Sequence, residues 1–148
     1  MTVQFRQGRR EDVPAAVAML RDDALGAGRE ISDLEPYLTA FDAMVETTGN
    51  MLIVGELAGD VVAIYQLTLI DGLSLRAARR AQIEGVRVAA NLRGQGIGGL
   101  LMQDAEQRAR AGGANLLQFT SNSTRTEAHA FYARHGYEAS HTGFKKML

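Results

Sequence analysis

The stretch that decides the fold is residues 82–98, which read QIEGVRVAANLRGQGIG. Its first part is rich in β-branched side chains and predicts a strand over 82–88. The alternation of apolar side chains breaks inside this strand, because Ile83 is out of phase with the valines that follow Gly85. A glycine at such a break is typical of a β-bulge, so we expect a bulge at Gly85.

A glycine-rich loop follows this strand and leads into a helix. Glycines let the backbone curl until successive N–H groups point at one spot, and the positive end of the helix dipole adds to their field. Such a loop is a natural site for a pyrophosphate, although a tight turn without a ligand would use the same glycines. The pyrophosphate interpretation assigns the loop to Arg93, Gly94, Gln95, Gly96, Ile97 and Gly98.

Two other phosphate-binding loops fit the sequence less well. Gly94, Gly96 and Gly99 satisfy the dinucleotide pattern G-x-G-x-x-G, but residues 114–119, about 20 positions on, contain no acidic partner for a ribose. A P-loop ends in Gly-Lys-Ser/Thr, and residues 98–100 read Gly-Gly-Leu. A Rossmann site is therefore weakly supported, and an NTPase is not expected.

The rest of the chain alternates strand and helix patterns. Before the bulged strand we expect a strand near 3–6, a helix from Asp12 and Pro14 to near Gly26, a helix capped by Ser32 and Glu35, and a hairpin of 51–57 and 61–70. After it we expect a helix over 96–110, a strand over 116–120, a helix capped by Thr124 and Glu127 that ends at Gly136, and an extended segment over 137–148. The strand–helix–strand unit over 82–120 predicts parallel pairing, and the hairpin predicts antiparallel pairing.

These elements predict the fold class. It is α/β (α+β), with a mixed central sheet flanked by about four helices in the order βααβββαβαβ. No linker, repeat or low-complexity tract divides the chain, so we expect a single domain over residues 1–148.

Composition narrows the class of protein. The 16 Lys and Arg against 17 Asp and Glu give a net charge of -1, so no overall field draws the chain to nucleic acid or to an anionic membrane. There is no cysteine, which excludes disulfides, thiolate metal sites and a cysteine nucleophile. His129, His135 and His141 have no acidic residues at ligand spacing, so we expect no metal site. No segment resembles a signal peptide or a membrane helix, and we expect a cytoplasmic protein.

Three motifs together resemble the GNAT-type N-acetyltransferase family. They are Glu84-Gly85-Val86-Arg87-Val88, Arg93-Gly94-Gln95-Gly96-Ile97-Gly98, and Ala128-His129-Ala130-Phe131-Tyr132 with Gly136-Tyr137. The predicted element order fits the fold of that family. Within it, the chain is most similar to the aminoalkylphosphonate acetyltransferase branch, through Thr120-Ser121-Asn122, Arg125, Ala128-His129-Ala130-Phe131-Tyr132 and the closing Ser140-His141-x-Gly143-Phe144.

The resemblance implies acetyl-CoA as a cosubstrate and assigns its parts to the chain. The amides of residues 93–98 would hold the pyrophosphate, and the bulged strand would open a V-shaped cleft for the pantetheine arm. The backbone of Val86, Arg87 and Val88 would line the thioester.

The helix near the C-terminus departs from the family pattern at one position. Many members have Asn three residues before the residue that is Ala128 here, whereas this chain has Arg125. Asn122 lies close by, so whether Asn122 or Arg125 meets the coenzyme arm stays open. His129 is expected to pack or to contact the coenzyme.

Three residues are candidates for the chemistry of acetyl transfer, which needs a neutral amine, a stabilised oxyanion and a proton for the leaving thiolate. Glu84 can take the ammonium proton directly or through a water, or it is an ordinary exposed strand carboxylate. The amide of Val88 or a neighbour can meet the oxyanion, because a bulge leaves N–H groups unpaired. Tyr132 can supply the proton, since a phenol and a thiol differ by only about 1.5 pKa units, or it packs beside Phe131.

Two functions of different classes follow from these interpretations. The first is an N-acetyltransferase that moves an acetyl group from acetyl-CoA to a primary amine of a small molecule or peptide, by direct transfer in a ternary complex. The second is a non-catalytic CoA- or nucleotide-binding sensor on the same fold, in which Glu84 and Tyr132 are inert. The extended C-terminal segment is compatible with a homodimer.

The connection before the bulged strand carries Arg76, Arg79 and Arg80. A solvated polar loop is the favoured interpretation. The sharper alternative is that these guanidinium groups hold an anionic group on the acceptor, because arginine pairs with carboxylates and phosphonates in a bidentate manner.

Overall fold

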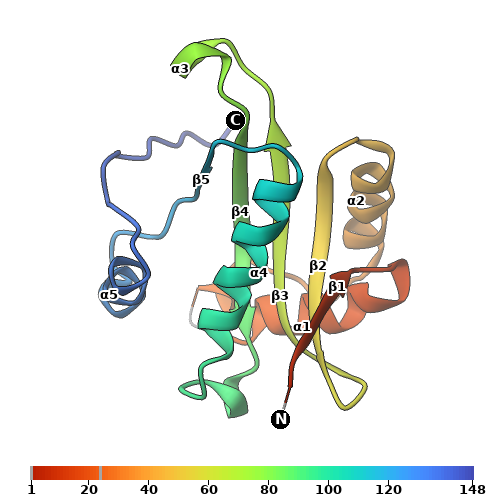
Figure 1. Cartoon of the computed structure of the whole chain (residues 1–148). Coiled ribbons are helices and arrows are strands. Elements are labelled where there is room, and N and C mark those ends of the chain that lie inside the picture. The colour runs from red at the N-terminus through yellow and green to blue at the C-terminus, as the bar shows by residue number, and fades with distance from the viewer. Residues whose placement is uncertain (1, 24) are drawn as a thin grey trace. The chain divides into compact units, whose positions relative to one another are not determined.

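The computed structural model describes residues 2–23 and 25–148. The chain divides into two compact units, Met1–Gln118 and Phe119–Leu148. The first unit is built on a five-stranded sheet of β1 (Gln4–Gln7), β2 (Asn50–Leu57), β3 (Asp60–Ile70), β4 (Arg80–Val88) and β5 (Leu116–Gln118) (Figure 1). The strands pair in chain order, antiparallel except for the parallel pair of β4 and β5. The predicted mixed sheet is confirmed.

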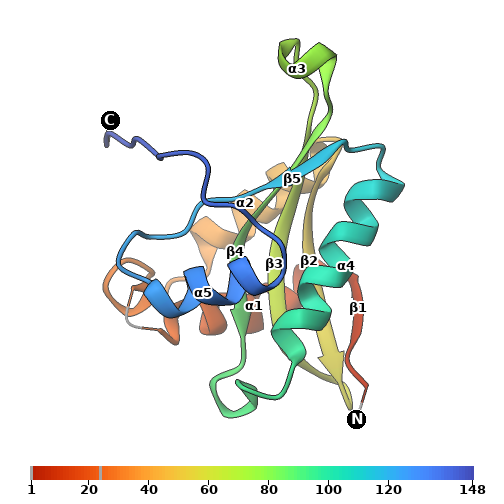
Figure 2. The same cartoon turned by 60° about the vertical axis from the view of Figure 1, so that its left-hand side comes forward.

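Helices cover both faces of this sheet. The helices of the first unit are α1 (Val13–Arg21), α2 (Glu35–Glu46), the short α3 (Ser74–Ala77) and α4 (Ile97–Ala111), with 3-10 turns at Arg10–Asp12, Gly26–Gly28 and Ala90–Leu92. Figure 2 shows α1 and α2 on one side of the sheet and α4 on the other. No helix among residues 2–23 and 25–148 is long and apolar enough to cross a membrane.

The core follows from strand alternation, because successive side chains of a strand point to opposite faces. On the face of α1, Val54 and Ile64 are buried against Ala16. On the face of α4, Tyr65 is fully buried, and its hydroxyl donates a hydrogen bond of 2.5 Å to Oδ2 of Asp104. Each helix layer therefore has its own set of buried strand residues.

The predicted hairpin and bulge are both present. The turn between β2 and β3 places Ala58 at φ 51° and Gly59 at φ 87°, the two positive angles of a primed turn that matches the strand twist. In the β3–β4 ladder Ile64 pairs with Arg87 and Gln66 pairs with Glu84, so Tyr65 alone faces the two residues Gly85 and Val86. Gly85 has φ 63°, which explains why a glycine marks the bulge.

Both predicted capping boxes are wrong. Helix α2 begins after Leu34 instead of Ser32, and the amide of Glu35 donates to Oδ1 of Asp33 at 3.1 Å. Ahead of α5 (Thr126–Arg134), the Thr124 hydroxyl donates to Oδ1 of Asn122 at 2.7 Å and caps nothing. In both places an Asp or Asn side chain forms a local turn that competes with the predicted cap.

The first helix also ends earlier than predicted, at Arg21 instead of near Gly26. The amide of Gly26 donates to Oδ1 of Asp23 at 2.5 Å, and a Cβ at Gly26 would overlap the carbonyl oxygen of Leu20. A glycine is therefore needed at position 26, because the chain turns back closely against the end of α1 there. Residue 24, inside the predicted helix, lies outside the described residues.

The second unit contains α5 and an aromatic cluster. Phe119, Phe131, Tyr132 and Tyr137 form this cluster, with ring centroids 4.3 Å apart for Phe119 and Tyr132. The extended strand expected over 137–148 is not among the strands of the described chain, where these residues have no regular secondary structure. A terminal strand needs a partner edge, which its own alternation pattern does not specify.

Candidate functional site

The loop between β4 and α4 has the geometry of an anion cradle. Gly94 and Gly96 adopt φ 79° and 85°, and Gly96 is the N-cap of α4. No side chain caps this 15-residue helix, so the amides of its first turn stay available at the positive end of the dipole. A Cβ added at either glycine would meet nothing within 4 Å. The positive φ angles and the open space above the loop therefore account for the two glycines, and close internal packing does not.

Arg93 fixes the start of this loop. Its Nε donates to the carbonyl of Val88 at 3.3 Å, and its terminal NH2 group donates to the carbonyl of Asp22 at 3.3 Å. Because Asp22 follows α1 and Val88 ends β4, the exposed guanidinium joins the two segments beside the loop. Close by, Ala18, Met19, Asp22 and Ala89–Asn91 line a pocket of about 540 Å³.

The bulge is held by a buried ion pair that sequence reasoning missed. Arg87, only 7% exposed, contacts Oδ2 of Asp23 at 2.6 Å and donates to the carbonyl of Val86 at 2.9 Å. The family resemblance implies that the backbone of Arg87 lines the thioester. The structure shows a separate contact of its side chain, the ion pair with Asp23. The sequence signal for this ion pair is the position of Arg87 after the bulge, because the bulge turns that strand position to the buried face.

The edge of β4 beyond the bulge is open on the side of β5. Strand β5 pairs only with Arg80, Ala81 and Gln82. The amide of Ala89 donates to Val62 in β3 at 2.8 Å, so the amide of Val88, one residue earlier, points to the opposite edge. The backbone at Val86–Val88 therefore presents groups that the sheet leaves without a β5 partner.

Tyr65, which faces the bulge from β3, is fixed to α4. Its hydroxyl donates to Asp104, and Asp104 also accepts a hydrogen bond of 2.7 Å from Nε of Arg108. Burial, followed by the hydrogen bond to Asp104, raises the pKa of Tyr65. Tyr65 is thus a neutral donor that joins the bulge region of the sheet to the helix that follows the glycine loop.

Glu84 lies one residue before the bulge and is exposed. It pairs with Gln66 of β3, and directly paired residues share a face of the sheet, here the face of α1. The carboxylate forms no ion pair within the described chain. Its position allows contact with a ligand on this face.

The same face carries a row of polar side chains that the sequence reasoning did not identify. Its members are the half-buried Asn50, Gln66, Gln82 and Gln118, which we call the amide row. The in-register pair of Gln82 with Gln118 and the hydrogen bond of 2.9 Å from Gln66 to Asn50 set them side by side in two pairs. The signal is visible only when the alternation of several strands is aligned, because each strand alone looks like an ordinary half-exposed strand.

The three arginines before the bulge have different surroundings. Arg79 lies 3.7 Å from Asp71, and its amide donates to Oδ1 of Asn115 at 2.9 Å. Arg80 follows it at the start of β4, in register with Ile70 and Leu116. Arg76 is in α3, where three successive residues adopt positive φ. Of the three, Arg80 lies on the same face of the sheet as Glu84, because the two residues are four positions apart in β4.

In the second unit, the ring of Tyr132 is packed. It lies 4.3 Å from Phe119, 5.3 Å from Phe131 and 6.4 Å from Tyr137, measured between ring centroids. The ring of His135 lies against Phe131 in a tilted arrangement, with the ring centroids 4.4 Å apart. These aromatic contacts hold the ring of Tyr132 in place.

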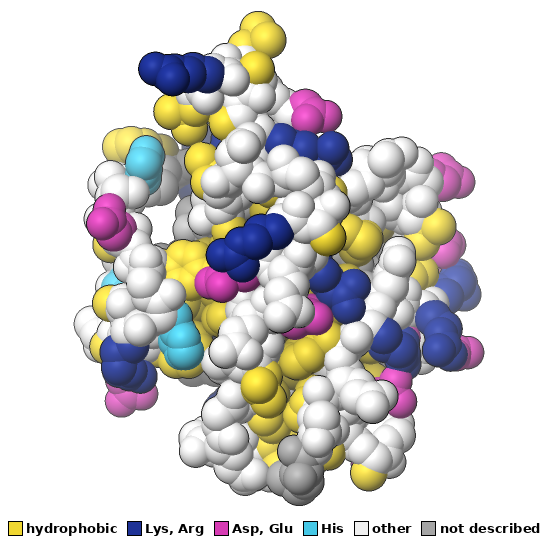
Figure 3. Space-filling view, in the orientation of Figure 1, with side chains coloured by type: hydrophobic (Ala, Val, Ile, Leu, Met, Phe, Trp, Pro, Cys, Tyr) yellow, Lys and Arg dark blue, Asp and Glu magenta, His cyan; other side chains and the backbone are white. Residues whose placement is uncertain are grey.

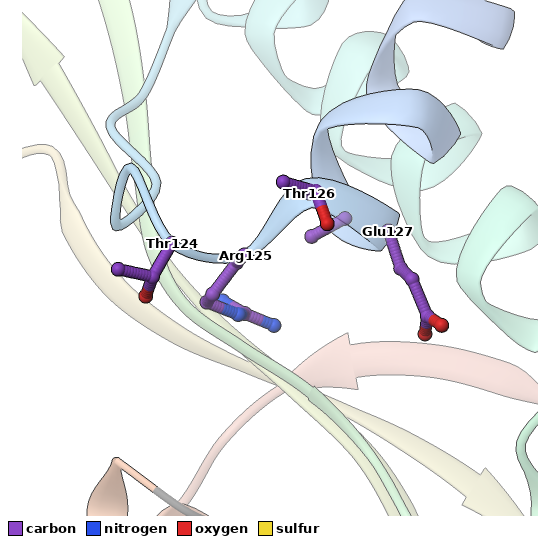
Figure 4. A pocket seen from close by; sticks show the side chains of 5 residues that line it. Thr124, Arg125, Thr126 and Glu127 are labelled. Atoms are coloured by element: carbon purple, nitrogen blue, oxygen red, sulfur yellow. The ribbon is translucent and has the colours of Figure 1, made fainter.

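Asn122 and His129 build the start of α5. Oδ1 of Asn122 accepts a hydrogen bond of 3.0 Å from the amide of Thr124, and its carbonyl accepts one of 2.9 Å from Nε2 of His129. Because a carbonyl only accepts, His129 carries its proton on Nε2. Arg125, whose amide also donates to the Asn122 carbonyl, lines a shallow pocket of about 400 Å³ with Thr124, Thr126, Glu127 and Ala128 (Figure 4).

Charges elsewhere are mixed in sign. On the side of the molecule shown in Figure 3, basic and acidic side chains are interspersed and gather into no patch of one sign. Within residues 2–23 and 25–148, no three His, Asp or Glu side chains form a group that could hold a metal ion.

Comparisons with known proteins add to this geometry. The protein-family model described as the acetyltransferase (GNAT) family matches residues 16–137 of the sequence, which include parts of both units. The chain is 43% identical to the aminoalkylphosphonate N-acetyltransferase of Salmonella typhimurium over 67 residues, which are 45% of this chain and 44% of that protein. The match thus spans less than half the length of that relative.

Solved structures resemble the chain over nearly its full length. A crystal structure described as a transcriptional regulator from Bacillus halodurans C-125 has a TM-score of 0.95 and 36% identity, and the match covers 99% of this chain and 100% of that one. A predicted acetyltransferase with acetyl-CoA from Clostridium acetobutylicum has a TM-score of 0.77 and 15% identity, covering 99% of this chain and 97% of that one. The second likeness concerns the fold alone.

Proposed function

Since the chain belongs to the GNAT acetyltransferase family, we propose that it is an N-acetyltransferase that moves the acetyl group of acetyl-CoA directly to a primary amine of a small molecule or peptide. The observation that carries this proposal is the loop of residues 93–98. Its two left-handed glycines lead from the bulged β4 into an uncapped helix N-terminus. Acetyltransferases of this fold use acetyl-CoA, and the loop fits its pyrophosphate.

The residues of the first unit suit the coenzyme in two places. The amides of residues 93–98 would hold the pyrophosphate, because the space above both left-handed glycines is open. The open edge of β4 at Val86–Val88 would take the pantetheine arm, since its amides have no partner in β5. When bound, the thioester supplies an activated acetyl group.

Proton removal from the amine is assigned to Glu84. A primary amine is mostly protonated at neutral pH and attacks only after losing a proton. The exposed carboxylate of Glu84 lies next to the bulge and has no competing ion pair within the described chain. It accepts the proton directly or through a water. The amide of Val88, which points to the open edge of β4, stabilises the oxyanion that forms.

Tyr132 is assigned the proton donor for the departing thiolate. A phenol and a thiol differ by only about 1.5 pKa units, so proton delivery can accompany departure of the thiolate. The attacking nitrogen loses its second proton as the amide forms, and this proton restores the phenol. Aromatic packing holds the ring in place. No covalent acetyl-enzyme is required, and the chain has no cysteine that could form an acetyl thioester.

A second candidate function is a CoA- or nucleotide-binding sensor. The 36% identity over the full chain to a structure described as a transcriptional regulator favours considering it. In that case the glycine loop binds its ligand while Glu84 and Tyr132 are inert.

Release of free CoA separates the two functions. The protein is incubated with acetyl-CoA and a panel of primary amines, and CoA is measured with a thiol reagent, to which the cysteine-free chain contributes no background. Amine-dependent CoA release supports the transferase. Binding of CoA by calorimetry without release for any amine supports the sensor.

A further inference from the structure

The face of the sheet beside Glu84 carries several polar side chains, where a covered sheet face is usually apolar. Four in-register pairs place polar side chains across β2, β3, β4 and β5: Asn50 with Thr68, Gln66 with Glu84, Thr68 with Gln82, and Gln82 with Gln118. Farther along the same face, Val54 and Ile64 are buried under α1. The polar side chains lie beside apolar ones on this face, because Leu52, which packs with the helix core, is in register with Gln66.

Hydrogen bonds between its members order the amide row, and its side chains keep donors and acceptors that these bonds do not use. Gln66 donates from Nε2 to Oδ1 of Asn50 at 2.9 Å, and Gln118 donates from Nε2 to Oε1 of Gln82 at 3.2 Å. These bonds leave the Oε1 acceptors of Gln66 and Gln118 and the amide donors of Asn50 and Gln82 without a protein partner in the described chain. Half-buried donors and acceptors held in place in this way are suited to a ligand that alternates the same groups.

On this face β4 carries a positive charge at its start, Arg80, and a negative charge just before the bulge, Glu84. Arg80, Gln82 and Glu84 are alternate residues of one strand and therefore point to the same face. Neither Arg80 nor Glu84 forms an ion pair within residues 2–23 and 25–148. The strand thus presents a cation, an amide and an anion in sequence.

The spacing sets the length of a ligand that meets both charges. The Cα atoms of Arg80 and Glu84 are four strand positions apart, about 13 Å. Each charged contact takes about 3 Å, which leaves about 7 Å between the amine and the anionic group of the ligand. Two extended amino-acid residues span about that length.

From this arrangement we infer that the acceptor is a dipolar amine of dipeptide length, with its amine at Glu84, a hydrogen-bonding spacer along the amide row and a carboxylate or phosphonate at Arg80. The inference rests on the proposed function and specifies its acceptor. An α-amino acid or an aminomethylphosphonate is too short to reach both charged residues.

A series of small acceptors tests the length and the spacer. Glycine, diglycine and tetraglycine vary the separation of amine and carboxylate, 5-aminopentanoate matches diglycine in length without an amide, and diglycinamide lacks the anion. With saturating acetyl-CoA, we expect kcat/KM to be at least about tenfold higher for diglycine than for each of the others, because each loses a hydrogen bond or a charge contact. Equal kcat/KM for diglycine, glycine and 5-aminopentanoate would overturn the inference.

Two variants assign the effects to residues. Arg80→Gln should abolish the preference for diglycine over diglycinamide, and Gln82→Leu should abolish the preference for diglycine over 5-aminopentanoate. Arg110→Gln, at an exposed arginine of α4 on the other side of the sheet, is the matched control and should keep both preferences. Circular dichroism checks that all three variants are folded.

A binding measurement separates failure of this inference from failure of the proposed function. Calorimetry of diglycine with the CoA-bound protein reports acceptor binding without turnover. Acetylation of simple alkylamines with no Arg80-dependent preference for diglycine overturns the inference and leaves the N-acetyltransferase intact. Arg80-dependent binding of diglycine with no acetylation of any amine supports the recognition surface and refutes the transferase. Absence of both refutes both.

Discussion

Replacing Gly96 by alanine tests the glycine loop against a control that the chain itself provides. Gly96 has φ 85°, and a Cβ there would meet nothing within 4 Å. Gly59, in the turn between β2 and β3, has φ 87° and equally open space. Either alanine therefore adds left-handed backbone strain without a steric clash in the free protein. We expect each to lower the free energy of unfolding by about 1 kcal/mol, or Tm by about 2–4 °C.

The two variants should differ in acetyl-CoA binding. The Cβ at position 96 enters the space above the loop, where a pyrophosphate would approach the amides of α4. Loss of one hydrogen bond to a charged group weakens binding by about 1.5–3 kcal/mol, so we expect the acetyl-CoA Kd of Gly96→Ala to rise at least about tenfold. Gly59→Ala should bind like wild type.

Calorimetric titration with acetyl-CoA measures both affinities, and thermal unfolding checks that the two strains match. A Gly96→Ala variant with the wild-type Kd would refute the assignment of the pyrophosphate to this loop. An equal loss of affinity in both variants would show that the effect is general destabilisation.

Three further predictions concern catalysis and stability. Tyr132→Phe should keep the acetyl-CoA Kd but lower kcat by about 10²–10⁴-fold, and wild-type kcat would return Tyr132 to a packing role. Glu84→Gln should lose most activity below the pKa of the amine, where deprotonation limits the rate, and a pH–rate profile like that of wild type would argue against the base. The hydrogen bond from Arg6 holds the pKa of Asp12 below its usual value, so this carboxylate stabilises the fold above about pH 4 and loses that effect as the pH falls through its folded-state pKa. The difference in urea stability between wild type and Asp12→Asn should therefore shrink between about pH 6 and pH 3, and a constant difference would contradict this account.

Local signals predicted much of the first unit. The break in alternation at Gly85 predicted the bulge correctly, because the extra residue shifts every later side chain to the other face. The glycines at 94 and 96 predicted a loop that needs positive φ, and both have it. These features are fixed by a few adjacent residues, so the sequence alone carries them.

Features that depend on distant residues were missed or wrong. The amide row exists only through cross-strand register, since Asn50 and Gln118 are far apart in the chain. Arg79 and Arg80 looked like one cluster, yet Arg79 turns to Asp71 while Arg80 enters the strand. The partner of Arg87, Asp23, follows a helix whose end was placed too late.

Transfer of a labelled acetyl group tests the central proposal most directly. The protein is incubated with acetyl-CoA that carries an isotopic label in the acetyl group, with and without a primary amine, and mass spectrometry follows the label. We expect the label on the amine nitrogen in equal amount to the CoA released, and none on the protein when the amine is left out. Binding of acetyl-CoA with no label on any amine would contradict the N-acetyltransferase, and label on the protein alone would contradict direct transfer.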